Sequence, residues 1–195
     1  MIPSVNQLTP NTGRFLDETD IARNIVEAVT GAIKTITSDH AAIHKGEGFG
    51  ISGIFSGVAN SSTVNYAFKT PSVASGKHIH LKYKDIQATA NKIRVDLYEA
   101  PTNAPTNGTD LTPVNRNRVG TPTATSMQAV KSGMTLDLTG ATLLNSEQFV
   151  SNQARSLDIE YVLKPNTWYV RTFTNGTGGA ADISFFEFWY EEPSI

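Results

Sequence analysis

Alternation of apolar and polar residues after Gly46 is the feature that most constrains the fold of this chain. Apolar side chains occupy every second position in several short segments, as Val64, Tyr66 and Phe68 do. This period of two is typical of strands that bury one face and expose the other. With the turn residues between segments, it predicts strands at residues 50–58, 62–70, 77–86, 91–100, 126–131, 134–138, 157–163, 167–174 and 183–191.

Eight or nine strands with no helical pattern between them predict a mainly β protein. We expect an antiparallel β-sandwich, jelly-roll-like in arrangement, over residues 46–195. The sequence contains no cysteine, so packing or assembly must hold this domain together in place of disulfides.

One long connection, Ala100–Thr125, interrupts the succession of strands. It has three prolines after position 104 and almost no large apolar residue. A loop of this length in a compact domain is usually functional or lies on a partner. We therefore predict a surface-binding loop formed by Asn115, Arg116, Asn117 and Arg118.

The N-terminal residues follow a different pattern. Residues 1–16 begin with a polar stretch rich in Pro, Asn and Thr, which predicts an extended arm that orders only against another surface. From Asp17, an acidic first turn and a helical spacing of apolar residues predict one α-helix over residues 17–45. Gly31 costs this helix about 1 kcal/mol relative to Ala, so a partner must cover its apolar stripe.

The predicted helix carries a heptad seam, because its apolar residues are spaced four, three, four and three positions apart. Two interpretations stay open: the helix packs on its own domain, or copies of the chain associate along the seam. β-branched residues at both core positions favour three strands, so the second interpretation predicts a homotrimer. The residues assigned to oligomer or capsid contact are Ala22, Val26, Val29, Ile33, Ile36 and His40.

Histidines at the end of the predicted helix suggest a metal, but the pattern is incomplete. His40 and His44 stand four positions apart, as zinc ligands on a helix do, yet Ala41 occupies the place of a metalloprotease general base. We interpret His40 as a polar layer of the seam. His78 and His80 share a strand face without a third ligand nearby in sequence, so no metal is predicted there either.

Three glycines of the stretch Gly48–Gly53 match the dinucleotide-binding motif in letters only. That motif follows a strand and opens a helix, whose N-terminus faces the pyrophosphate. Here the predicted helix precedes the glycines and a strand follows them. We therefore expect no nucleotide and no other cofactor.

Carboxylate pairs give weak support for catalysis. Asp96 with Glu99, or Asp158 with Glu160, would support hydrolysis only if the two side chains converged in a cleft. The sequence also lacks a Gly-x-Ser-x-Gly nucleophile motif. We expect a protein that is not an enzyme.

Aromatic residues crowd the last predicted strand, where alternation places large rings on both faces. A strand of this kind is central in a sandwich or is covered by another chain. A core role, an inter-subunit surface and a sugar-stacking platform are the three interpretations. Phe186, Phe188 and Tyr190 would lie on one face, and Phe185 and Trp189 on the other.

Charge and hydropathy argue against two classes of partner. The 16 basic residues nearly balance the 18 acidic ones, so the chain lacks the broad basic field that nucleic-acid binding needs. No segment approaches the length of a membrane span, and the N-terminus has no signal-peptide pattern. We expect a protein made and retained in a cytosol.

Several segments, in their order along the chain, resemble small virion proteins of tailed bacteriophages, of the head-decoration, cement or head-fibre kind. The resemblance runs from about Asp17 onward and rests on the order of the segments more than on any one of them. The segments are "HAAIHKGEGF", "KHIHLKYKDIQATANKIRVDLYEAP", "LTPVNRNR" and "YVLKPNTWYVRTFTNGTGGAADISFFEFWYEE".

The resemblance implies a jelly-roll-like sandwich bound to the outside of an icosahedral head, often as a trimer, with no catalytic residue. The major capsid protein and further copies of this chain are the implied partners. The implied location is the capsid exterior of a virion made in the bacterial cytoplasm. The alternative is a receptor- or glycan-binding module of a head fibre, spike or tail, which would expose Trp168, Trp189 or the Ala100–Thr125 loop around a polar groove.

Overall fold

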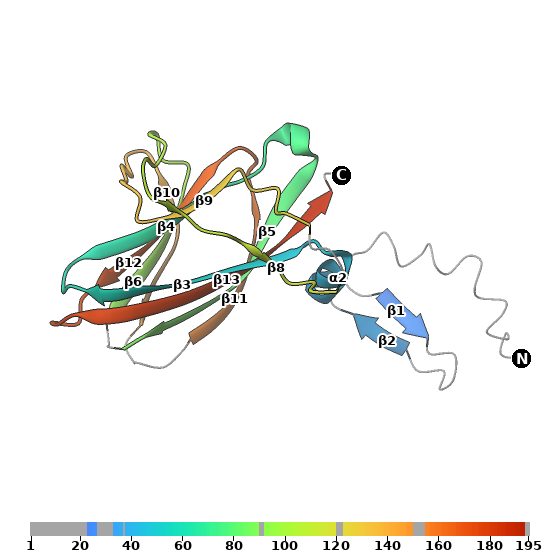
Figure 1. Cartoon of the computed structure of the whole chain (residues 1–195), viewed down its shortest axis with the longest axis horizontal. Helices are drawn as coiled ribbons and strands as arrows, with labels where there is room; N and C mark the ends of the chain where they lie inside the picture. Colours follow the sequence, from blue (N-terminus) through green and yellow to red (C-terminus); the bar gives the residue numbers. More distant parts are fainter. Residues whose placement is uncertain are drawn as a thin grey trace, which may run out of the picture.

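Two antiparallel sheets pack face to face with a short helix at one end (Figure 1). The structure is a computed structural model that describes residues 23–26, 33–36, 38–89, 92–119, 123–149 and 155–193. The predicted fold class, a mainly β antiparallel sandwich, is confirmed.

Five strands form one sheet and six form the other. The five-stranded sheet has the order β11 (Arg155–Leu163), β5 (Lys77–Ala88), β13 (Ala181–Pro193), β3 (Gly48–Val58) and β8 (Val114–Asn115). The six-stranded sheet has the order β10 (Thr142–Phe149), β6 (Ile93–Glu99), β12 (Trp168–Asn175), β4 (Thr63–Lys69), β9 (Ala129–Ser132) and β7 (Thr109–Asp110). A single turn of 3-10 helix, η2 (Val73–Ser75), lies between β4 and β5.

The order of the strands is that of a jelly roll. Eight long strands form two four-stranded layers, β3-β13-β5-β11 and β4-β12-β6-β10, and the chain changes sheet between successive long strands except from β6 to β10, which are neighbours in one sheet. This is the connectivity of two Greek keys. The three short strands β7, β8 and β9 come from the long connection between β6 and β10, and they extend the two sheets at one side.

Alternate residues of the long strands form the core between the sheets. In β6, Ile93, Val95 and Leu97 are fully buried, whereas Arg94 is exposed. Aromatic rings from both sheets meet in this layer. The rings of Tyr66 on β4 and Phe185 on β13 are stacked, with centroids 4.6 Å apart.

Both faces of β13 are covered by the chain itself. Phe185 and Trp189 belong to the core between the sheets, and Phe188 and Tyr190 are buried on the outer face with Phe186 packed beside them. The predicted division of the aromatic residues between two faces is confirmed, and so is the core interpretation.

The segment predicted as a strand at residues 134–138 has another role. Its pairing as a strand is limited to one isolated bridge between Thr135 and Thr106. The segment lies over the outer face of the six-stranded sheet. Met134 is buried there in a cluster with Ala67 of β4 and Val170 of β12. β10 was not predicted, because its apolar residues do not alternate and a bulge shifts its register between Leu143 and Asn145.

The predicted helix over residues 17–45 is wrong in the residues described before Ser38. β1 (Arg23–Val26) and β2 (Ile33–Ile36) pair as antiparallel strands, and the helix α2 spans only Ser38–Lys45. β-branched residues favour strands over helices, and this part of the chain is rich in Ile, Val and Thr.

The heptad seam is therefore not a helical face. Val26 lies opposite Ile33 across the strand pair, and Ile36 lies opposite Arg23. Ala22 and Val29, like the arm at residues 1–16, lie outside the described residues. The predicted trimer loses the support of a helical seam and stays a prediction.

Three glycines allow close packing at the start of the sandwich. A Cβ atom on Gly48 would lie 2.8 Å from Ile43 of α2, and one on Gly50 would lie 2.9 Å from the Phe186 ring. A Cβ on Gly53 would lie 2.7 Å from the ring of Phe185. A helix precedes these glycines, as predicted, and β3 contains all three, whereas the predicted strand began at residue 50. The motif therefore serves packing and does not have the arrangement of a phosphate loop.

We expect Gly53→Ala to lower the free energy of unfolding by about 1–3 kcal/mol, because the added methyl group must displace a packed aromatic ring. Gly179→Ala is the matched control, since a Cβ there meets no atom within 4 Å. It should change stability by less than about 0.5 kcal/mol. Urea denaturation of both variants checks this, and equal stabilities would contradict the packing role of Gly53.

Candidate functional site

Helix α2 is fixed to the end of the sandwich where β3 begins. Ala42 is buried against Phe188 and Tyr190 on the outer face of the five-stranded sheet. A backbone hydrogen bond also joins the residues after α2 to β13, because the N–H of Glu191 donates to the carbonyl of Glu47 at 2.9 Å. We call α2, residues 46–48 and residues 188–191 the α2 junction.

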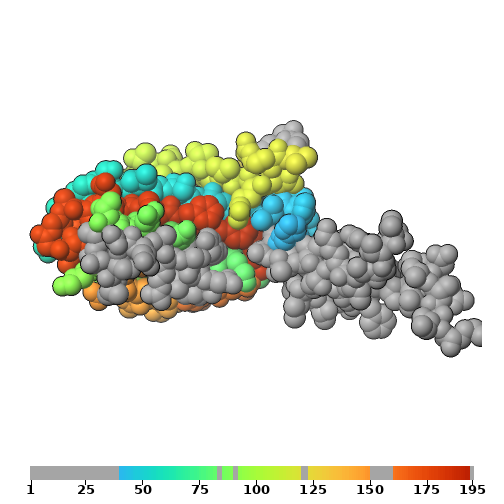
Figure 2. All heavy atoms as spheres, turned by 90° about the horizontal axis from the view of Figure 1, so that it is seen from below, coloured from blue at the N-terminus to red at the C-terminus, as the bar shows by residue number. Residues whose placement is uncertain are grey.

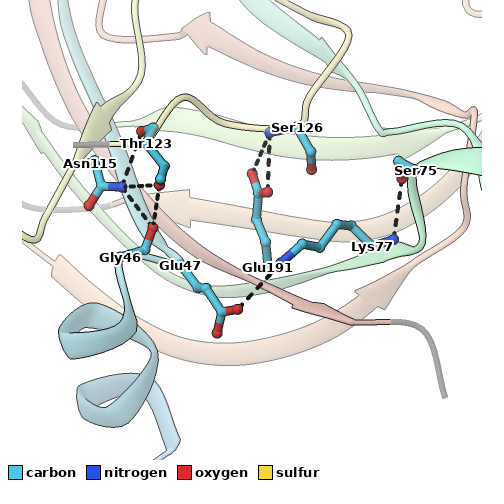
Figure 3. A network of polar contacts seen from close by, with 8 residues as sticks. All are labelled: Gly46, Glu47, Ser75, Lys77, Asn115, Thr123, Ser126 and Glu191. Atoms are coloured by element: carbon cyan, nitrogen blue, oxygen red, sulfur yellow. Dashed lines mark hydrogen bonds and ion pairs between the residues drawn. The ribbon is translucent and has the colours of Figure 1, made fainter. Parts of the chain in front are cut away.

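A loop from the long connection fastens the α2 junction. We call its described residues, 115–119 and 123–126, the strap. Asn115 is buried, and its Nδ2 donates to the carbonyl of Gly46 at 2.7 Å and to Oγ1 of Thr123 at 3.0 Å (Figure 3). Asn117 Nδ2 donates to the carbonyl of His44 at 2.8 Å, which satisfies a group at the C-terminal end of α2.

The other end of the strap binds the last strand. Glu191 is buried, and its carboxylate accepts hydrogen bonds from the backbone N–H of Ser126 at 2.9 Å and from Oγ1 of Thr125 at 2.5 Å. Lys77 on β5 adds an ion pair with Glu47 at 3.3 Å. In Figure 2, atoms of the strap (yellow) lie directly beside those of α2 (blue). The strap therefore joins α2 to the C-terminal strand of the sandwich.

The structure separates the residues of the predicted surface-binding loop. The side-chain amides of Asn115 and Asn117 bind backbone carbonyls of the same chain. The Arg116 guanidinium lies 5.0 Å from the centroid of the Phe188 ring. Arg118 is exposed. Binding of a partner by this loop stays a prediction.

A charged cluster lies on the outer face of the five-stranded sheet, around His80 and Glu160. Nδ1 of His80 lies 3.1 Å from Oε1 of Glu160, and its Nε2 lies 3.3 Å from Oε2 of Glu192. Lys82 Nζ and the Tyr190 hydroxyl donate to Glu160 at 2.9 and 2.6 Å. The cluster links β5, β11 and β13.

These contacts change the titration of Glu160. Burial alone would raise the pKa of its carboxyl, but the hydrogen bonds from Tyr190, Lys82 and His80 outweigh burial and lower the pKa to about 2. Stabilisation of the charged form by donated hydrogen bonds is the physical cause. The ionised carboxylate therefore contributes to folding at neutral pH.

A second ion pair crosses the core. Arg171 on β12 and Glu187 on β13 point toward each other between the sheets, and both side chains are only 3% exposed. Nε of Arg171 lies 3.2 Å from Oε2 of Glu187 and donates also toward the hydroxyl of Tyr66 at 3.3 Å. Burial raises the pKa of Glu187 well above its ordinary value. Burial also lowers the pKa of Arg171 to about 10, a shift that the charges of Glu147 and Tyr161 oppose.

The carboxylates considered for hydrolysis are not arranged for it. Asp96 faces the outside of the six-stranded sheet, where Arg94 and Ser146 bind it, whereas Glu99 binds Tyr169 and Lys164. Asp96 and Glu99 stand at positions of opposite parity in β6, so they occupy opposite faces of the strand. The side chain of Asp158 lies outside the described residues.

The part of the chain that the structure describes contains no group of three or more His, Asp or Glu side chains arranged to hold one metal ion, and no helix long and apolar enough to span a membrane. A cavity between the sheets, beside Tyr66, Glu187 and Trp189, holds about 10 Å³, which is room for about one water molecule. It is too small for a substrate.

Neither tryptophan offers an open stacking surface. Trp189 is 2% exposed in the core, and Trp168 is half-buried under residues 134–138. The aromatic groove that the glycan-binding alternative needs is therefore not formed by these two residues.

Comparisons with known proteins give no family. No family model and no curated protein matches the sequence. Among solved structures, the chain is similar to one entitled "Structure of infectious bursal disease virus Gt strain", at 8% identity over 89% of this chain and with a TM-score of 0.14. This chain covers 46% of that one, and a TM-score so low supports no conclusion on fold or function.

The sequence offered partial signals for these features. Arg171 and Glu187 stand at inward positions of two predicted strands, with opposite charges, and that coincidence could have indicated the buried pair. The alternating His and Lys residues of β5 could have indicated the outer cluster. The strap had no such signal, because its asparagine side chains bind backbone groups far away in the sequence.

We expect Glu160→Gln to destabilise the protein at pH 7 and to make stability less dependent on pH. The folded pKa of about 2 lies below the ordinary value of 4.5, so the stabilisation is full above about pH 4.5 and is lost as the pH falls toward 2. Solvent screening limits its size, because the side chain is 38% exposed.

The measurement is the free energy of unfolding of the wild type and the variant between pH 7 and pH 2. The difference between them should shrink over the acidic part of this range. Asp110→Asn is the control, since Asp110 is 82% exposed and contacts Lys131 alone among the ion pairs described. A difference that stayed constant with pH would contradict the assigned role of Glu160.

Proposed function

We propose that this chain is a structural protein of a bacteriophage virion, which binds the outside of the capsid and stabilises it. The observation that carries the proposal is the eight-stranded jelly-roll connectivity, an architecture that viral capsid domains use. This support is an analogy of fold. The order of sequence segments that resembles head-decoration, cement and head-fibre proteins adds to it.

The α2 junction explains how such a protein could transmit force. Residues before α2 precede the sandwich in the chain and, in the proposal, contact the major capsid protein. Tension on them reaches α2 first. The helix passes it to the sandwich through the buried Ala42, through Asn117 on the carbonyl of His44, and through the bonds of Asn115 to Gly46.

Several copies would strengthen attachment. In the proposal the chain acts as a homotrimer, so that each trimer makes three weak contacts to the capsid. Each contact after the first is then intramolecular, and the combined affinity can exceed that of one contact by about 10² to 10⁴. The proposal includes no catalysis, no cofactor, no membrane and no nucleic acid.

We expect deletion of residues 1–16 to abolish binding to phage heads while the protein stays folded. These residues precede the described part of the chain, and the sandwich, the strap and α2 do not include them. The measurement is co-sedimentation of the full chain and the truncated chain with heads that lack the protein. A circular-dichroism melting curve for each shows whether the fold is retained.

Arg118→Ala in the full chain is the companion variant, because this strap residue is exposed and belongs to the predicted surface-binding loop. If the truncated protein sediments with heads as well as the full chain does, the capsid-binding role of the N-terminal residues is wrong. If Arg118→Ala alone abolishes binding, the strap is the binding surface.

A further inference from the structure

The two histidines of α2 lie on the protein surface, whereas the sequence predicts His40 to lie within a heptad seam. His40 and His44 are exposed, on the side of α2 away from the buried Ala42. Their rings lie edge to face with centroids 4.7 Å apart, and the two Nε2 atoms are 3.0 Å from each other. His40 is thus not a buried polar layer, and two ligand atoms converge at one point of the surface.

This separation is the one that two imidazole ligands have on a single metal ion. Zinc binds histidine nitrogen at about 2.0–2.1 Å, so two nitrogens at angles of about 90 to 110° lie about 2.9 to 3.4 Å apart. In the free protein, one neutral ring can donate to the other across the observed 3.0 Å. A metal ion bound by both nitrogens takes the place of the shared proton, and each exposed ring turns its Nε2 lone pair toward it.

The backbone that carries the pair is already fixed. Ala42 between the two histidines is buried, and Asn117 of the strap binds the carbonyl of His44 itself at 2.8 Å. Binding a metal therefore requires little ordering of the helix, which reduces the entropy lost on binding. His44 also lies in the last turn of α2, where the helix dipole favours a positive charge.

We infer that His40 and His44 form a two-ligand site for a divalent transition metal of the borderline class, such as Zn²⁺, Ni²⁺ or Cu²⁺. Imidazole nitrogen suits these ions, whereas Mg²⁺ and Ca²⁺ prefer oxygen ligands. Two protein ligands leave the other coordination positions to water or to a donor from another molecule. The bound ion links His40 to His44 and so stabilises α2. This helix connects the N-terminal residues to the sandwich.

The test is isothermal titration of the untagged full chain with Zn²⁺ in a non-coordinating buffer. One Zn²⁺ should bind per chain, and Mg²⁺ should give no binding signal. His40→Gln and His44→Gln should each weaken binding by at least about tenfold, since each removes one of two ligands. Both residues are exposed, so the variants should fold, and melting curves check this. His78→Gln is the matched control, and it should bind Zn²⁺ as the wild type does.

A spectroscopic measurement identifies the ligands directly. The chain has four histidines, so its NMR spectrum contains four imidazole Hε1 signals. Substoichiometric Cu²⁺, which is paramagnetic, should broaden the signals of His40 and His44 before those of His78 and His80. Unchanged Zn²⁺ affinity in His40→Gln and His44→Gln, or loss of binding in His78→Gln, would overturn the inference. It does not depend on the proposed function, since neither measurement involves a capsid.

Discussion

The fold depends on one joint between its two sheets, where aromatic rings and a buried ion pair connect β12 to β13. Each of these strands lies inside its sheet and pairs with a neighbour on both sides, so whatever fixes β12 against β13 fixes the other strands as well. Arg171 and Glu187 meet across this joint, beside the stacked rings of Tyr66 and Phe185. Removing one partner of such a pair typically costs about 3–5 kcal/mol, because a charge is then buried alone. The pair therefore restricts which residues of the two sheets can face each other.

β13 also connects this joint to the α2 junction. Its inward residues, Phe185, Glu187 and Trp189, belong to the core between the sheets, and its outward residues Phe188 and Tyr190 support α2. At the end of the strand, the side chain of Glu191 binds the strap. β13 thus contributes to the core, packs against α2 and binds the strap. In the proposed function, these contacts connect the residues before α2 to the core of the sandwich.

Much of the sandwich could be predicted from the sequence, because strand alternation is a local property. It located β3, β4, β5, β6 and the last three strands, and it divided the aromatic residues of β13 correctly between two faces. The same reasoning failed before Ser38, where Ile and Val spaced as in a heptad form strands, since these residues suit both patterns and favour the second. The strap could not be foreseen, because Asn115 and Asn117 bind carbonyls about 70 residues away in sequence. Such bonds exist only once the tertiary structure has formed.

The central claim is that the residues before the sandwich attach the chain, while the jelly roll is the rigid body that they hold. Amide hydrogen exchange of the full chain, free and bound to phage heads, tests it most directly. The account predicts that binding slows exchange in the N-terminal residues and α2 and leaves β12 and β13 unchanged. Slower exchange on the outer face of the six-stranded sheet, at residues 134–138, with the N-terminal residues unaffected, would contradict it.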